Sequence, residues 1–155
     1  RLDDPELHPI REELALALEE LRELAHGLFP PILTSEGLEP ALEAAARRAG
    51  LPVRVDAGDI GRLEPELEAA VYFCCVEALQ NAAKHAGPGV RASVRLARTP
   101  DALEFAVEDD GVGFAPGDGY GLTHLRDRIE ALGGAAQVTS APGRGTAVRG
   151  RVPLV

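Results

Sequence analysis

The chain has 155 residues, a length that suits one domain with a modest extension. Its formal net charge of −9 excludes a nucleic-acid-binding surface, which needs a dense basic patch. No apolar run approaches the roughly 18 residues of a membrane span, so we expect no membrane segment in this chain.

Residues 5–28 form the first expected element, a coiled-coil-like helix. Its apolar residues recur at alternating steps of three and four: Leu7, Ile10, Leu14, Ala17, Leu21, Leu24 and Leu28. This heptad spacing predicts a seam that faces a partner helix, although an amphipathic helix packed on its own domain would look similar. Pro30 and Pro31 are expected to end the helix, because proline has no amide hydrogen.

The rest of the chain alternates between helical and strand patterns. In order, we expect a helix at 38–49, a strand at 51–55, a helix at 64–85, strands at 90–96 and 103–108, a helix at 122–132, and strands at 136–140 and 146–154. Antiparallel hairpins and separate helices indicate an α+β fold. It should be a two-layer sandwich in which helices cover one face of a mixed β-sheet.

The long helix carries two different stripes. One is apolar and should face the sheet: Leu67, Val71, Cys74, Ala78 and Ala82. The other contains Glu77, Asn81, Lys84 and His85, at positions i, i+4, i+7 and i+8. A solvated helix face could show the same polar residues. Asn81, however, is a poor helix-interior residue with no local reason to be there.

The polar stripe is suited to a metal ion and phosphates. An amide oxygen such as that of Asn81 fits Mg²⁺, which takes few protein ligands beside substrate phosphates. Glu77 could hold or deprotonate a metal-bound water, or orient the attacking group. Lys84 is placed to offset phosphate charge, while His85 either binds a phosphate or caps the helix.

Asp109 and the glycines after it predict a site for an aromatic base. Asp109 ends an apolar strand, and its carboxylate can accept from the exocyclic amine that adenine has and guanine lacks at the same position. Gly111 and Gly113 have no side chains, so a flat ring could approach the backbone. A simple Asp-Gly turn is the alternative. We expect Asp110 to point the other way and to be structural.

A second glycine motif opens the next helix. It consists of Gly119, Tyr120, Gly121 and Leu122. Free amides at a helix start, together with the helix dipole, make an anion site. The short stretch 114–118 before it is a candidate lid over bound phosphates.

Three further polar residues lie near these motifs in the sequence. Arg126 and Arg128 are expected on a solvated face of the helix at 122–132, with a contact to phosphate or to a partner as the alternative. Thr146 starts the last strand, where its hydroxyl could reach the adenine edge through water.

Taken in order, the motifs resemble the ATP-binding domain of bacterial sensor histidine kinases, in the group that shares the Bergerat nucleotide fold. The run 77–85 is similar to the family's N box, 109–113 to its first glycine box and 119–122 to its second. The resemblance covers about residues 38 to 154. The short lid and the run 125–134 look like the nitrate-sensor and membrane-fluidity-sensor subgroup.

The resemblance implies roles for the motif residues. Asn81 would coordinate Mg²⁺, Glu77 would be the acidic catalytic residue and Asp109 would select adenine. Lys84 and the amides around Gly119 and Gly121 would hold phosphates. The implied reaction moves the γ-phosphoryl group of ATP to a histidine and then to an aspartate of a response regulator.

The resemblance also implies a division of the chain. Residues 1–30 would be all or part of the second dimerisation helix, and 31–155 the catalytic domain. Neither His8 nor His26 matches the phosphoacceptor motif, so the acceptor should lie on another helix of the same kinase. We therefore expect ATP binding without self-labelling. A homodimer through residues 5–28 is the expected partner arrangement if this half of the bundle is sufficient, and whether the chain dimerises is left open.

The chain starts at Arg1 and has no methionine, which suggests a fragment or a processed chain. Its two cysteines, Cys74 and Cys75, are sequence neighbours with no metal spacing, and we expect both to be buried. A reducing, cytoplasmic location fits, and a membrane anchor elsewhere in the full-length protein is left open.

Two other functions share part of this pattern. An anti-sigma-factor serine kinase has the same boxes, but the coiled-coil-like helix before the domain argues against it. A non-enzymatic module, in which ATP only orders the lid to dock a partner, is the other. The presence of both Glu77 and Asn81 speaks against that interpretation.

Overall fold

A computed structural model describes residues 10, 13–18, 21, 30–115 and 122–155. The chain divides into two compact units, residues 1–30 and Pro31–Val155. In the first unit, residues 13–18 are helical with exposed side chains, and much of the helix predicted over 5–28 lies outside the described residues. Within the described part of the chain, no helix is long and apolar enough to cross a membrane.

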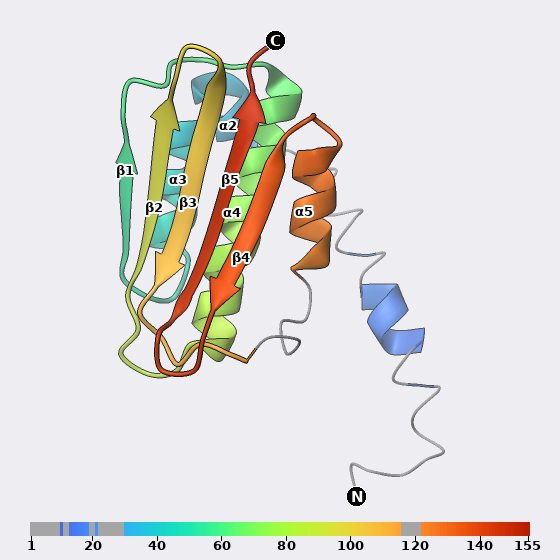
Figure 1. Cartoon of the computed structure of the whole chain (residues 1–155), viewed down its shortest axis with the longest axis vertical. Helices are drawn as coiled ribbons and strands as arrows, with labels where there is room; N and C mark the ends of the chain where they lie inside the picture. The colour runs from blue at the N-terminus through green and yellow to red at the C-terminus, as the bar shows by residue number, and fades with distance from the viewer. Residues whose placement is uncertain (1–9, 11–12, 19–20, 22–29, 116–121) are drawn as a thin grey trace, which may run out of the picture. The chain divides into compact units, whose positions relative to one another are not determined.

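A mixed five-stranded sheet forms the centre of the second unit. Its strands are β1 (Val53–Ala57), β2 (Ala92–Arg98), β3 (Ala102–Asp109), β4 (Ala135–Ser140) and β5 (Thr146–Pro153). They lie in the order β1-β2-β3-β5-β4, with only β1 and β2 parallel. One face is covered by helices α3 (Leu38–Arg47), α4 (Pro65–His85) and α5 (Thr123–Glu130) (Figure 1). The predicted α+β sandwich is therefore confirmed.

The strand register brings three polar residues together at one end of the sheet. Thr146, the first residue of β5, pairs with Asp109 at the end of β3. On its other side it pairs with Ser140 at the end of β4. Residues directly opposite each other on antiparallel strands project from the same face. Asp109, Thr146 and Ser140 are thus neighbours, although they are far apart in the sequence.

Helix α4 is the main helix of the core. The predicted apolar stripe is buried throughout: Leu67, Val71, Cys74, Ala78 and Ala82. Tyr72, Cys75 and Leu79 are buried as well, because α4 packs against α3 in addition to the sheet. Both cysteines are free thiols in this core, as expected.

The ends of several elements differ from the prediction. β1 starts at Val53, two residues later than expected, and Pro52 before it has no amide hydrogen to give to a strand ladder. A short helix α2 (Pro31–Glu36) was not predicted, because Pro31 was interpreted only as a helix terminator. Proline is well tolerated in the first turn of a helix, where its missing amide hydrogen would have no partner.

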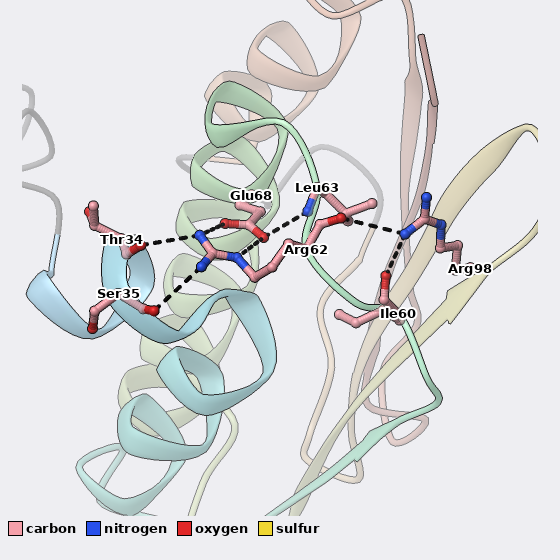
Figure 2. A network of polar contacts seen from close by, with 7 residues as sticks. All are labelled: Thr34, Ser35, Ile60, Arg62, Leu63, Glu68 and Arg98. Carbon is pink, nitrogen blue, oxygen red and sulfur yellow. Dashed lines mark hydrogen bonds and ion pairs between the residues drawn. The ribbon is translucent and has the colours of Figure 1, made fainter.

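A buried carboxylate fixes the start of α4 (Figure 2). Glu68 is only 1% exposed and accepts hydrogen bonds from Arg62 Nε at 3.1 Å, Arg62 Nη2 at 3.3 Å and the Leu63 amide at 3.0 Å. Arg62 also donates to the backbone carbonyls of Thr34 and Ser35 in α2. This network ties α2 to the first turn of α4, the helix that carries the polar stripe.

Candidate nucleotide-binding site

A cavity of about 310 Å³ lies between α4, the last residues of β3, the first residues of β5 and the start of α5. It is lined by Ala78, Asn81, Ala82, His85, Ala86, Val107, Asp109, Gly113, Phe114, Leu122, Thr146 and Val148. Most of these residues are apolar, and the polar side chains are few. That composition is typical of small-molecule sites, in which a few polar groups fix the orientation of the ligand.

Asn81 supplies the cavity with an unsatisfied polar atom. Its side-chain nitrogen Nδ2 is buried and has no hydrogen-bond partner among the described residues. Buried polar atoms are nearly always paired in folded proteins, so an unpaired one in a cavity wall needs a reason. A bound ligand with acceptor oxygens would provide it.

The carboxylate of Asp109 is held in a defined orientation. Its Oδ1 accepts a hydrogen bond from the Gly111 amide at 2.9 Å, and the side chain is half-buried in the cavity wall. Among the residues the structure describes, no protein group bonds its second oxygen, Oδ2. An acceptor is therefore available to a ligand in the cavity.

The side chain of Asp110 bonds the backbone and does not face the cavity. Its Oδ1 accepts from the Arg91 amide at 2.7 Å on the exposed side of the sheet end. Asp110 is not among the cavity-lining residues, which confirms the structural role predicted for it. The two adjacent carboxylates thus offer a natural comparison of a site residue with a structural one.

The loop after Asp109 needs both of its glycines for close packing. A Cβ atom on Gly111 would lie 2.3 Å from the Ala86 Cβ at the end of α4. Gly113 has a positive φ of 63°, and a Cβ there would lie 2.1 Å from the Ala141 carbonyl oxygen. At these positions the missing Cβ is required by the protein's own backbone, and of the two glycines only Gly113 also lines the cavity.

Thr146 is linked to a small hydroxyl network behind the cavity. Its Oγ1 lies 2.9 Å from the Ser140 Oγ. Ser140 Oγ also accepts from the Phe114 amide at 2.9 Å and donates to the Gly145 carbonyl at 3.0 Å. The network joins the ends of β4 and β5 to the segment that leaves Gly113.

The other predicted site residues fall into three groups. His85 and Leu122 line the cavity, whereas Glu77 is half-buried one turn before Asn81 and Lys84 is exposed, and neither of these two lines it. Gly119, Tyr120 and Gly121 lie outside the described residues. The predictions for these three residues therefore stay predictions.

One arginine of α5 is placed differently from the expectation. Arg126 is exposed, as predicted for a solvated face. Arg128 is half-buried, with its guanidinium carbon 5.3 Å from the ring centroid of Phe73 on α4. The prediction of a solvated Arg128 was wrong, because α5 docks on α4 through this cation–π contact. The Cys74 thiol, 3.6 Å from the Leu125 carbonyl oxygen, lies at the same junction.

Sequence reasoning missed several cavity residues. Val107 and Val148 lie two positions from Asp109 and Thr146 on the same strands, so the two-residue strand period could have placed them in the wall. Phe114 was treated only as part of a lid. Ser140, which does not line the cavity but contacts Thr146, gave no signal in the sequence, because its contacts depend on strand pairing.

The fold and the site together define a class of protein. A mixed sheet with helices on one face, and a cavity that joins an asparagine of the long helix to an aspartate at a strand end, is the arrangement of a nucleotide-binding ATPase domain. Residues 66–155 match the family described as histidine kinase-, DNA gyrase B- and HSP90-like ATPase. The chain belongs to this family.

Several relatives are sensor proteins. The chain is 34% identical over 152 residues to the nitrate/nitrite sensor protein NarX of Escherichia coli K12, and the alignment covers 92% of this chain and 25% of NarX. It is 31% identical over 154 residues to the sensor histidine kinase MctS of Rhizobium johnstonii, which covers 92% of this chain and 33% of MctS. The chain thus spans a quarter to a third of these curated relatives.

A solved structure has the same fold. The histidine kinase domain of the Erythrobacter litoralis EL346 blue-light activated histidine kinase superposes with a TM-score of 0.61 at 26% identity. The match covers 72% of this chain and 57% of that one.

Proposed function

We propose that this chain is the ATP-binding catalytic domain of a two-component sensor histidine kinase. It would transfer the γ-phosphoryl group of ATP to a histidine on a dimerisation helix of the same kinase, for relay to a response regulator. The observation that carries the proposal is one cavity that holds both the unpaired Asn81 amide and the Asp109 carboxylate. Relatives named as sensor histidine kinases support it.

Adenine would occupy the apolar part of the cavity. Asp109 Oδ2 is an acceptor that can receive a hydrogen bond from an exocyclic amine, and Thr146 lies beside it across the β3–β5 pair. Val107 and Val148 line the same cavity and can pack against the ring. These groups favour a 6-aminopurine over guanine, whose 6-oxo group is itself an acceptor.

Asn81 is the residue that would hold Mg²⁺. Among the described residues, no three His, Cys, Asp or Glu side chains gather into a metal site. A sparing ligand set of one amide oxygen and substrate phosphates is what Mg²⁺ commonly uses. When bound, the ion would offset negative charge on the phosphates. The partnerless Nδ2 of the same amide fits a site whose remaining acceptors come with the nucleotide.

The remaining roles follow from position along α4. Glu77, half-buried one turn before Asn81, would orient the attacking imidazole or take its proton. Lys84 and His85 are exposed at the end of α4 and would meet the phosphates. Gly119, Tyr120 and Gly121 would supply backbone amides to the same phosphates.

Residues 5–28 would form the dimer contact. Ile10, Leu14 and Leu21 are 58%, 61% and 62% exposed, and they belong to the heptad seam. Exposed apolar residues at a and d positions are suited to a partner helix. The phosphoacceptor histidine would lie on a helix that is not part of residues 1–155.

The first experiment is calorimetry with ATP and Mg²⁺ on the parent chain and on two neighbouring variants. Asp109→Asn removes the acceptor charge and should weaken ATP binding by about tenfold to a hundredfold, as expected for a hydrogen bond to a charged group. Asp110→Asn changes the adjacent carboxylate, which faces Arg91, and should leave the affinity unchanged. Equal effects of the two substitutions, or no binding by the folded parent chain, would contradict the assignment.

Phosphotransfer needs a second measurement. A longer form of the protein that contains the upstream helix should acquire label from γ-labelled ATP on histidine, in an acid-labile bond. Label on a partner's serine would instead identify a serine kinase. Tight ATP binding without any transfer would identify a nucleotide-gated interaction module.

A further inference from the structure

The hydroxyl of Ser140 has three hydrogen-bonding contacts at the end of the sheet. The Phe114 amide lies 2.9 Å from its oxygen, the Gly145 carbonyl 3.0 Å and the Thr146 hydroxyl 2.9 Å. Ser140 itself does not line the cavity, whereas Thr146 does. Its influence on a ligand must therefore pass through its neighbours.

Counting protons fixes the direction of each bond. A hydroxyl has one hydrogen to donate and two lone pairs to accept. The Gly145 carbonyl can only accept, so the single Ser140 hydrogen is committed to it. The Phe114 amide can only donate, so it takes one lone pair. The Thr146 hydroxyl must then be the donor to the second lone pair of Ser140.

This direction decides what Thr146 offers to the cavity. Its hydrogen points back to Ser140, so only lone pairs remain for a ligand. Asp109, the register partner of Thr146, also presents an acceptor, its Oδ2. Two neighbouring acceptors match a group with two N–H bonds, directly or through a water, and they repel an oxo group.

We propose that Ser140 is a positioning residue that makes the cavity selective for 6-aminopurine nucleotides by locking Thr146 as an acceptor. The inference rests on the proposed ATP site and adds to it the residue that sets the polarity of Thr146. Without the Ser140 hydroxyl, the Thr146 hydrogen is free to rotate and to donate to a 6-oxo group. Selectivity falls although neither cavity side chain has changed.

The test compares ATP with inosine triphosphate, which carries a 6-oxo group in place of the 6-amino group. The dissociation constants of both nucleotides are measured with Mg²⁺ by calorimetry on the parent chain and on Ser140→Ala. The ratio of the constants, inosine triphosphate over ATP, should fall about fivefold to tenfold in the variant, the equivalent of one hydrogen bond. Ser140→Thr keeps a hydroxyl, so its ratio should stay at the value of the parent chain.

A double-variant comparison separates positioning from general loosening. Thr146→Val removes the hydroxyl through which Ser140 is proposed to act. Adding Ser140→Ala to Thr146→Val should leave the ratio where Thr146→Val alone puts it. If Ser140→Ala lowers the ratio in the Thr146→Val background by as much as it does in the parent chain, Ser140 does not act through Thr146 and the inference is wrong.

Ser140→Cys provides a second variant in case Ser140→Ala does not fold. Its thiol is close in size and is a weak donor and acceptor, so the ratio should fall part of the way. If both nucleotides lose affinity equally and the ratio stays at the parent value, Ser140 is only structural and the inference is wrong. If the folded parent chain binds neither nucleotide, the proposed function fails and this inference fails with it.

Discussion

Asn81 is unfavourable for stability, and the proposed function gives it a role in binding. An asparagine inside a helix is unfavourable, and a buried amide nitrogen without a partner costs about 1–3 kcal/mol. Alanines at positions 78 and 82 line the same cavity and carry neither cost. In the proposed function, phosphates and Mg²⁺ offset the cost when the nucleotide binds.

The two buried cysteines have thiol pKa values above that of an exposed thiol. Burial raises the pKa of the Cys74 thiol from 9.0 to about 12, with Arg128 lowering it and Glu77 raising it to smaller extents. Burial, with a further contribution from Cys74, also raises the pKa of the Cys75 thiol well above 9.0. Both thiols stay protonated at neutral pH, so neither is a nucleophile in the folded protein.

We expect the folded chain to resist alkylation at pH 8 and to react at both thiols once unfolded in guanidinium. Because the folded pKa of Cys74 is above its unfolded value, the thiol contributes stability that is fully present below pH 9.0 and is lost as pH rises toward about 12. Denaturant midpoints should therefore fall across this range. In a Cys74→Ala, Cys75→Ala variant the fall should be smaller. Rapid alkylation of the native chain would contradict the burial.

At the scale of elements, α4 joins the structural and the functional parts of the domain. Its first turn is held by the Arg62–Glu68 network (Figure 2). Its last turns carry Asn81 and His85, which line the cavity. Arg98 of β2 adds a bond to the Ile60 carbonyl at 2.9 Å, which fixes the loop that carries Arg62. The helix is thereby anchored at the end farthest from the cavity.

Breaking this anchor should destabilise the domain. Glu68→Ala removes a carboxylate that is 1% exposed and leaves the Arg62 guanidinium and the Leu63 amide without their acceptor. We expect a loss of about 3 kcal/mol in the free energy of unfolding. The Arg62 side chain is 52% exposed, so water can recover part of its solvation, and the loss should not be larger.

The matched control lies on the same helical turn. Glu66 is exposed, and Glu66→Ala should change the free energy of unfolding by no more than about 0.5 kcal/mol. Urea titrations of the two variants and the parent measure both values. Similar stabilities for Glu68→Ala and Glu66→Ala would show that the network contributes little.

At the scale of the whole molecule, binding and folding are linked. A ligand that binds only the folded state stabilises it by RT ln(1 + [L]/Kd), which is about 2.7 kcal/mol at a hundred times Kd. The proposed site predicts that ATP with Mg²⁺ raises the stability of this chain by about that amount. Removing Mg²⁺ with a chelator should lower the effect.

Thermal unfolding with ATP, with and without Mg²⁺, measures this linkage. Asn81→Ala should lose most of the difference that Mg²⁺ makes, because Asn81 is the proposed protein ligand. A Lys84→Ala variant should keep the Mg²⁺ dependence while weakening ATP binding overall. If the parent chain is stabilised equally with and without the ion, Mg²⁺ has no part in the site.

The sequence predicted the larger elements of this fold well. The α4 stripe and the alternation along β2 and β3 are periodic over many residues, and periodicity reports which side chains are buried. Periodicity does not fix where an element begins. For this reason the predicted start of β1 was two residues too early and α2 was missed. Arg128 was misplaced for a related reason, since the helix pattern could not show that α5 docks on α4.

Motif spacing predicted that Asn81 and Asp109 belong to one site, and the structure places both in the wall of one cavity. The pairing of Thr146 with Asp109 on one side and with Ser140 on the other is visible only in the folded sheet. Local patterns record the period of a helix or a strand, whereas pairing between strands is set by packing across the sheet. The direction of the Thr146 hydroxyl, and with it the proposed selectivity, depends on that pairing.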